Sequence, residues 1–141
     1  MGAGEVTVRT AEILISRGHE VIIIEKDAAK VERLSDEMDC SFLTGDGSNP
    51  VVLREMSPEK TQVLFCLSDT DQTNLIAGLV GRSPGFERVI TSSENPAFEE
   101  IRRELGLENT IIPSRTISRY LADMVEGEDI PELSTVILPQ P

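Results

Sequence analysis

The sequence predicts an α/β fold in which a doubly wound parallel sheet forms the middle of three layers, αβα. Short apolar runs rich in β-branched residues alternate along the chain with segments whose apolar residues recur at helical spacing. The connections between them are short, and such an alternation gives right-handed crossovers that place helices on both faces of one sheet. The 141 residues suffice for one domain with a full core.

The elements follow in a regular order from the first helix onward. Asp27 caps the second helix, Pro50 opens the third, and Ser114 caps the last, while Gly78 inside the fourth helix indicates close packing. We expect one domain over residues 1–127 and a tail or linker over 128–141. The expected strands are 21–25, 40–44, 62–67, 88–91 and 110–112, and the expected helices begin near 5, 28, 50, 71, 97 and 114.

Composition excludes several classes of function. The formal net charge of −12 repels nucleic acid phosphates and anionic lipid. No apolar run is long enough for a membrane span, and no secretion signal is present, so we expect a soluble, cytosolic protein that does not insert directly into a membrane. Cys40 and Cys66 fit free thiols better than a disulfide. With His19 as the only histidine and no CxxC motif, a zinc site is excluded.

Two glycines at the start of the chain indicate a phosphate-binding turn. Gly2 and Gly4 precede a predicted helix, and Glu25 ends the following strand, as in the βαβ unit of Rossmann-like dinucleotide sites. Such a Glu accepts from ribose hydroxyls and repels a 2′-phosphate, which favours NAD over NADP, although the neighbouring Lys26 weakens this preference. Thr7 stands where the motif has a third glycine.

Polar loops follow the apolar strands at one edge of the predicted sheet. The loops that begin at Gly2, Glu25 and Gly45 should meet the loop at Ser68, because ligands in such sheets bind where the strand order reverses. The two aspartates of the Ser68 loop, Asp69 and Asp71, fit helix capping and dipole complementarity better than catalysis or metal binding. Asp46 fits either an Asx-type turn or a ligand contact, and Arg102 and Arg103 fit a solvated helix face.

Several motifs together resemble one family. In order and spacing, the chain is similar to the N-terminal nucleotide-binding domain of Trk-type potassium uptake regulators, also called the RCK, KTN or TrkA-N domain. The resemblance covers residues 2 to about 125. It rests on Gly-Ala-Gly-Glu-Val at 2–6, Arg-Gly-His-Glu-Val at 17–21, Glu-Lys-Asp at 25–27, Gly-Asp-Gly-Ser at 45–48, Ser-Asp-Thr-Asp-Gln-Thr-Asn-Leu at 68–75, Asn-Pro-Ala-Phe at 95–98 and Ile-Pro-Ser at 112–114.

The resemblance implies a cytosolic regulatory subunit that is peripheral to the cell membrane through a potassium transporter or channel subunit. It implies binding of NAD(H), or of ATP or ADP, and a homo-oligomer in which dimers joined by the last helix build a ring. The backbone around the glycines would hold phosphates, Glu25 and Lys26 would lie at the ribose, Asp46 and Gly47 at the adenine, and the 67–74 segment at the second half of the ligand. The implied binding residues are Gly2, Ala3, Gly4, Glu5, Val6, Glu25, Lys26, Asp46, Gly47, Leu67, Ser68, Asp69 and Asn74.

The chain departs from this family pattern at three points. Family members have a central strand directly before the glycines, and its absence here predicts a gap in the sheet, whether the start is truncated or another segment, such as residues 136–138, fills the gap. Thr7 in place of glycine should push the first helix slightly off the sheet. Ser92 stands where the family often has arginine, which favours a dinucleotide or diphosphate over a triphosphate.

Three functional hypotheses follow. The first is a nucleotide-sensing regulator that works by ligand-biased conformational change without catalysis. The second is the cofactor-binding part of an NAD-dependent oxidoreductase, which lacks a substrate domain and an acid–base residue near the nicotinamide, because His19 lies at the wrong end of the sheet. The third is a fragment that binds nothing. We favour the first and expect no catalytic residues.

Overall fold

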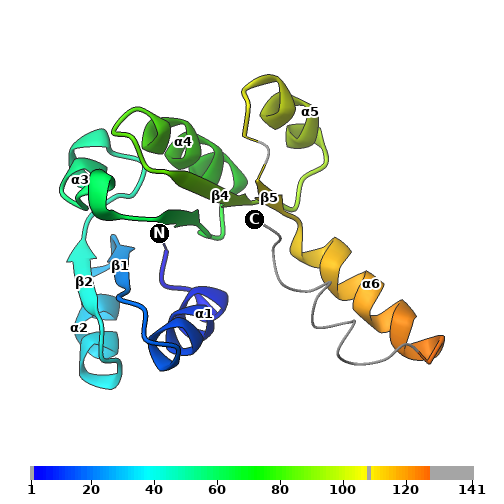
Figure 1. The fold of residues 1–141 in the computed structure, drawn as a ribbon, viewed down its shortest axis with the longest axis horizontal. Helices are drawn as coiled ribbons and strands as arrows, with labels where there is room; N and C mark the ends of the chain where they lie inside the picture. The colour runs from blue at the N-terminus through cyan, green and yellow to red at the C-terminus, as the bar shows by residue number, and fades with distance from the viewer. Residues whose placement is uncertain (1, 108, 128–141) are drawn as a thin grey trace.

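The computed structural model describes residues 2–107 and 109–127, and its helices and parallel strands alternate as the sequence predicts (Figure 1). The α/β fold class is therefore confirmed. A short 3-10 helix at Pro58–Lys60 precedes β3. The elements are α1 (Glu5–Ser16), β1 (Ile22–Glu25), α2 (Ala28–Glu37), β2 (Ser41–Thr44), α3 (Pro50–Arg54), β3 (Val63–Cys66), α4 (Asp71–Arg82), β4 (Arg88–Ser92), α5 (Ala97–Glu104), β5 (Thr110–Ile111) and α6 (Pro113–Val125).

The strands form two separate parallel sheets within the described residues. β1 pairs with β2, with Ile22 opposite Ser41, and β4 pairs with both β3 and β5. No ladder joins β1 to β3, which is the gap that the sequence predicts at the centre of the sheet. Residues 136–138, named above as one way to fill it, lie outside the described residues.

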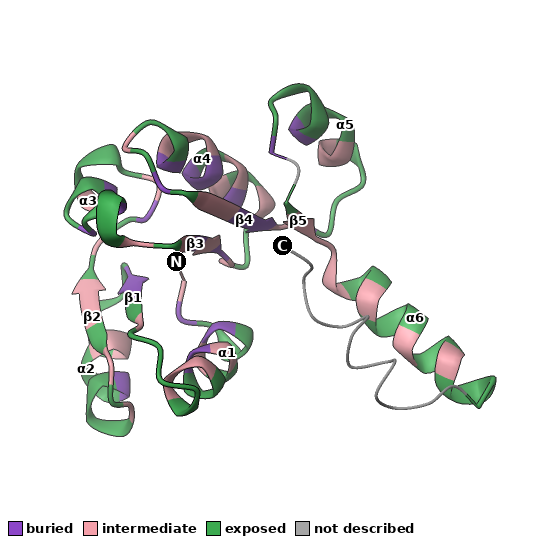
Figure 2. Cartoon of the chain, in the orientation of Figure 1, coloured by how far each residue is buried: buried purple, intermediate pink, exposed green. Residues whose placement is uncertain are grey.

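The core lies on both faces of β1. Ile23 packs with Ala3, Ala11 and Leu34 from the side of α1 and α2. Ile24, which points the opposite way because strand side chains alternate, packs into a second cluster that contains Leu53, Met56, Leu64, Cys66, Ala77 and Phe86. Figure 2 shows the buried residues along the inner sides of α1, α4 and the strands. The continuous apolar sequence of β1 therefore reflects a strand covered on both sides.

Gly78 lets α4 lie close to the sheet, as its position in a helix suggested. A Cβ atom added at Gly78 would lie 2.7 Å from the Thr91 Cγ2 atom of β4. That separation is shorter than carbon atoms tolerate, so the helix and the strand can approach this closely only because residue 78 has no side chain.

The predicted helix starts are partly confirmed. Asp27 caps α2, since its side chain accepts from the N–H groups of Ala29 and Lys30. Pro50 occupies the first turn of α3, as expected. The prediction that Ser114 caps α6 is wrong: the helix begins at Pro113, whose ring presets a helical φ, so Ser114 already lies inside the first turn.

Two further predictions concern side-chain environments. Both cysteines are free, as expected, and burial raises the pKa of the Cys66 thiol to about 11. The assignment of Arg102 to a solvated face is wrong, because only 2% of this residue is exposed. Its helix α5 is short and strongly two-sided, and the sequence could not show which side faces the core.

Candidate functional site

The glycine segment lies between the ends of the two sheets. The Gly2 N–H group donates to the Ile24 carbonyl at the end of β1, at 2.9 Å. Gly2 has φ +88°, and an added Cβ atom would lie 2.9 Å from the Ser68 Cα atom, just beyond β3. Only glycine fits this backbone conformation and this approach. The structure thus brings together the loops at Gly2, Glu25 and Ser68, which the sequence placed at the switch point.

The N-terminus of α1 is open. Gly4 is the N-cap residue with φ −75° and ψ 177°, and it has no side chain to bond the first-turn N–H groups of Glu5, Val6 and Thr7. A Cβ atom added at Gly4 would have no neighbour within 4 Å. Unbonded N–H groups and the positive end of the helix dipole make such a terminus suited to an anion. The predicted phosphate position is therefore accessible.

Glu25 holds the glycine segment from inside. Its Oε1 atom accepts from the Ala3 N–H group at 2.8 Å, and its Oε2 atom accepts from the Asp27 N–H group at 2.9 Å. Burial by itself raises the pKa of this carboxyl, but the amides of Asp27 and Ala3 and the charge of Lys30 outweigh burial and lower the pKa overall. Glu25 is ionised and only 8% exposed, so a ribose would have to share oxygens that already accept two hydrogen bonds.

Asp46 and Gly47, which the resemblance predicts at the adenine, lie in a compact loop beyond β2. The Gly45 N–H group donates to the Glu25 carbonyl at 2.9 Å, which brings this loop beside β1. The Asp46 Oδ1 atom accepts from both the N–H and the hydroxyl of Ser48, and these bonds lower the pKa of Asp46, with a smaller contribution from the charge of Lys26. These bonds form the Asx-type turn that was one of the two expectations for Asp46. Of the other residues predicted on this side of the site, Gly47 is buried and Lys26 is exposed.

A closed polar network joins β3, α4 and β4. The Asn74 Oδ1 atom accepts from the N–H and the hydroxyl of Ser68, both at 2.8 Å. The Asn74 Nδ2 atom donates to the carbonyls of Ser68 at 2.9 Å and Ser92 at 3.1 Å. Asn74 is 1% exposed, so its amide braces the strand ends from inside. Leu67 is half-buried beside this network, and Asp69 is exposed.

A hollow of about 490 Å³ opens between α1 and α2, next to the glycine segment. Ala3 and Gly4 line it together with three cationic and two acidic side chains, those of Arg9, Lys30, Arg33, Glu5 and Glu12. Arg9 also pairs with Glu5 at 3.1 Å. Sequence reasoning missed Lys30 and Arg33, although their spacing of three residues places them on one face of α2. Their positive charge lies beside the open helix terminus in a strongly acidic protein.

The family follows from a comparison of the sequence with family models. The model of the TrkA-N domain matches residues 1–113. The chain belongs to the TrkA-N domain family. This membership confirms the resemblance that the motifs indicated.

Two curated relatives are named as TrkA homologs of the Trk potassium uptake system. The chain is 28% identical over 133 residues to a Trk system potassium uptake protein TrkA homolog of Methanothermobacter thermautotrophicus, covering 94% of this chain and 62% of the relative. It is 34% identical over 128 residues to a TrkA homolog of Archaeoglobus fulgidus, covering 88% of this chain and 29% of the relative. The TrkA-N chain therefore spans less than two thirds of the length of these relatives.

Solved structures share the fold. The NAD(P)-binding domain of an exopolyphosphatase-related protein from Archaeoglobus fulgidus superposes with a TM-score of 0.81 at 20% identity, covering 90% of this chain and 95% of that domain. The GsuK channel bound to NAD superposes with a TM-score of 0.76 at 21% identity, covering 85% of this chain and 22% of that one. GsuK bound to ADP gives 0.75 at 20%, covering 86% and 32%. At these identities the likeness establishes a Rossmann-like fold.

In the part of the chain that the structure describes, no helix combines the length and the apolar character needed to cross a bilayer. Among residues 2–107 and 109–127, no three His, Cys, Asp or Glu side chains gather in a way that could hold a metal ion.

Proposed function

We propose that this TrkA-N domain is a cytosolic nucleotide-sensing module that regulates a potassium transporter or channel through conformational change. The observation that carries the proposal is the open α1 terminus at the junction of the two sheets, with the Gly2–Gly4 segment between the ends of β1 and β3. Family membership supports the link to potassium uptake, because the relatives named above are TrkA proteins.

The ligand that the site supports best carries a diphosphate. The residues fit such a group: the α1 amides offer donors, Gly4 leaves space above them, and Lys30 and Arg33 add positive charge. GsuK structures contain ADP and NAD, which share an adenosine diphosphate moiety. Ser92 offers no cation for a further phosphate. We therefore propose NAD(H) or ADP as ligands ahead of ATP.

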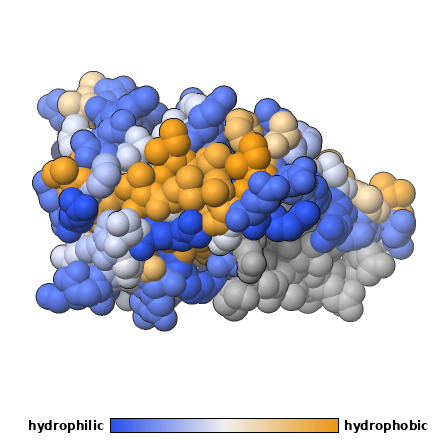
Figure 3. All heavy atoms as spheres, turned by 90° about the horizontal axis from the view of Figure 1, so that it is seen from above, coloured by the Kyte–Doolittle hydropathy of each residue, from blue (hydrophilic) through white to orange (hydrophobic). Residues whose placement is uncertain are grey.

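The exposed apolar surfaces support assembly of several copies. None of the residues of α6 is buried, and Ile117, Leu121 and Met124 share one of its faces at more than half exposure. The helix projects away from the rest of the molecule (Figure 1). Figure 3 shows a second hydrophobic band, over α4, where Ile76 is exposed. Two different apolar surfaces are what a ring of dimers requires, and we propose α6 as the dimer contact. The transporter subunit would bind this ring.

The decisive experiment places a negative charge where the phosphate should lie. In Gly4→Asp the new carboxylate bonds the first-turn amides and occupies the phosphate position, while an aspartate cap leaves α1 at least as stable as before. The matched control is Gly4→Ala, which adds only a Cβ atom in open space. We expect calorimetry with NADH, NAD, ADP and ATP to show binding to wild type and to Gly4→Ala, and at least about a tenfold loss in Gly4→Asp.

Other outcomes separate the alternatives. Equal binding by wild type and Gly4→Asp would refute the α1 terminus as the phosphate site. Binding by none of the four nucleotides would leave a domain that does not sense them. Sustained oxidation of NADH with a small substrate would favour the oxidoreductase interpretation, which the fold shared with an NAD(P)-binding domain keeps as the second candidate.

A further inference from the structure

The N-terminus of α6 is capped from a distant part of the chain. Its N-cap residue is Ile112, which has no oxygen in its side chain. The Glu94 Oε1 atom, twenty residues earlier, accepts from the Ser114 N–H group at 3.1 Å. This carboxylate lies at the positive end of the α6 dipole, so its charge also favours the contact. The start of α6 is therefore held by the loop that follows β4.

That same loop is held on its other side by α4. The Asp71 Oδ1 atom accepts from the Glu94 N–H group at 3.0 Å, and the Asp71 Oδ2 atom accepts from the Asn95 N–H group at 2.8 Å. Asp71 lies in the first turn of α4, as the dipole argument expected, but its hydrogen bonds go to this loop, and Thr70 occupies the N-cap position. The side chain thus joins two elements and does not cap its own helix.

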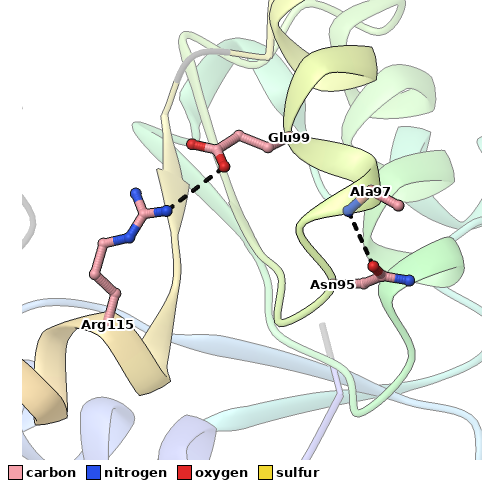
Figure 4. A network of polar contacts seen from close by, with 4 residues as sticks. All are labelled: Asn95, Ala97, Glu99 and Arg115. Atoms are coloured by element: carbon pink, nitrogen blue, oxygen red, sulfur yellow. Dashed lines mark hydrogen bonds and ion pairs between the residues drawn. The ribbon is translucent and has the colours of Figure 1, made fainter.

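The two carboxylates lie in series between the candidate ligand site and α6. Asn74, in the same first turns of α4 as Asp71, bonds Ser68 beside Gly2 and the Ser92 carbonyl at the end of β4. A second contact runs parallel to the Glu94 cap: the Glu99 side chain of α5 pairs with Arg115 of α6 at 3.5 Å, and the Asn95 Oδ1 atom accepts from the Ala97 N–H group at the start of α5 (Figure 4).

We propose that Asp71 and Glu94 are positioning residues that couple the ligand edge of the sheet to the orientation of α6. A displacement of the β3 and β4 ends moves Asp71 with α4, Asp71 moves the 94–95 amides, and the Glu94 carboxylate moves the first turn of α6. The Asp71 and Glu94 steps are hydrogen bonds from backbone N–H groups to a carboxylate, so each carboxylate is tied to the main chain of the next element. The role of Asp71 and Glu94 in sensing a ligand rests on the proposed function, whereas the coupling between the strand ends and α6 does not.

A ligand-free experiment tests the coupling first. Hydrogen exchange of the α6 amides at 114–118 is compared in Asp71→Ala, Glu94→Ala and the double variant, with Glu94→Gln as the conservative variant and Glu100→Ala as the exposed control. We expect each single alanine variant to speed exchange at least threefold, and the double variant to match Glu94→Ala, because a serial relay is broken once. Glu94→Gln should stay near wild type, since its amide oxygen still accepts.

Two results would overturn the relay. One is additive effects of the two alanine variants, which would make them independent contacts. The other is unchanged α6 exchange in Asp71→Ala at retained overall stability. Should an alanine variant fail to fold, Asp71→Ser and Glu94→Ser repeat the cycle, because each removes the carboxylate while it keeps a polar side chain.

A second arm uses ADP as the probe. In wild type, saturating ADP should change α6 exchange, and in Glu94→Ala it should bind with affinity within about twofold while the change at α6 disappears. A full α6 response in Glu94→Ala would refute the relay and leave the nucleotide proposal standing. If wild type binds no ADP, the nucleotide proposal fails for this ligand, and the ligand-free cycle still decides whether the coupling exists.

Discussion

Glu25→Gln gives the sharpest test of how the glycine segment is held. The carboxylate accepts one N–H group on each oxygen, from Ala3 and from Asp27. Glutamine keeps the shape but replaces one oxygen with an NH₂ group, which faces an N–H donor and cannot accept from it. One charge-assisted hydrogen bond is lost and one amide remains unpaired, so we expect unfolding free energy to fall by about 2 kcal/mol.

The measurement is denaturant unfolding of wild type and Glu25→Gln, with Glu20→Gln, an exposed glutamate just before β1, as the control. The control should change stability by less than about 0.5 kcal/mol.

Because the folded-state pKa of Glu25 is lowered below its usual value of 4.5, the carboxylate contributes stability above that pH and loses it as the pH falls through the folded pKa. The difference between wild type and Glu25→Gln should therefore be constant above about pH 5 and shrink below it. Equal stability of the two proteins at pH 7 would show that the Glu25 carboxylate does not hold the glycine segment.

Two further changes test the packing. Gly78→Ala should destabilise the fold by about 1–3 kcal/mol, because its Cβ atom would meet the Thr91 side chain at 2.7 Å. Alanine is the better helix former, so helix propensity alone predicts the opposite sign. Thermal unfolding measures the effect, and a rise in Tm would contradict the packing argument. Arg102→Leu should leave the free energy of unfolding unchanged or raise it by about 1 kcal/mol, since the Nε and Nη2 atoms of the buried guanidinium have no hydrogen-bond partner. Denaturant unfolding measures this. A loss of more than about 2 kcal/mol would show that the charge of Arg102 is needed.

Local patterns in the sequence were enough for the elements and their order. The apolar run of β1, the Asp27 cap and Pro50 at the start of α3 all depend on neighbours within a few residues, and each is confirmed. The gap between β1 and β3 was also expected, from the resemblance to a family whose members have a strand before the glycines. The binding roles of the listed site residues stay predictions.

Tertiary structure decided what the polar side chains do. The sequence placed Asp71 at its own helix, yet its carboxylate accepts from backbone amides of the loop after β4. Glu25, whose ribose contact stays a prediction, accepts from the Ala3 amide of a distant segment. Ser114 is likewise not a cap, because Glu94 supplies the acceptor for α6. These partners lie twenty or more residues apart along the chain. A carboxylate can accept from any N–H group within reach. Its sequence neighbours determine which helix or loop carries it, and only the packing of the elements determines which amide it meets.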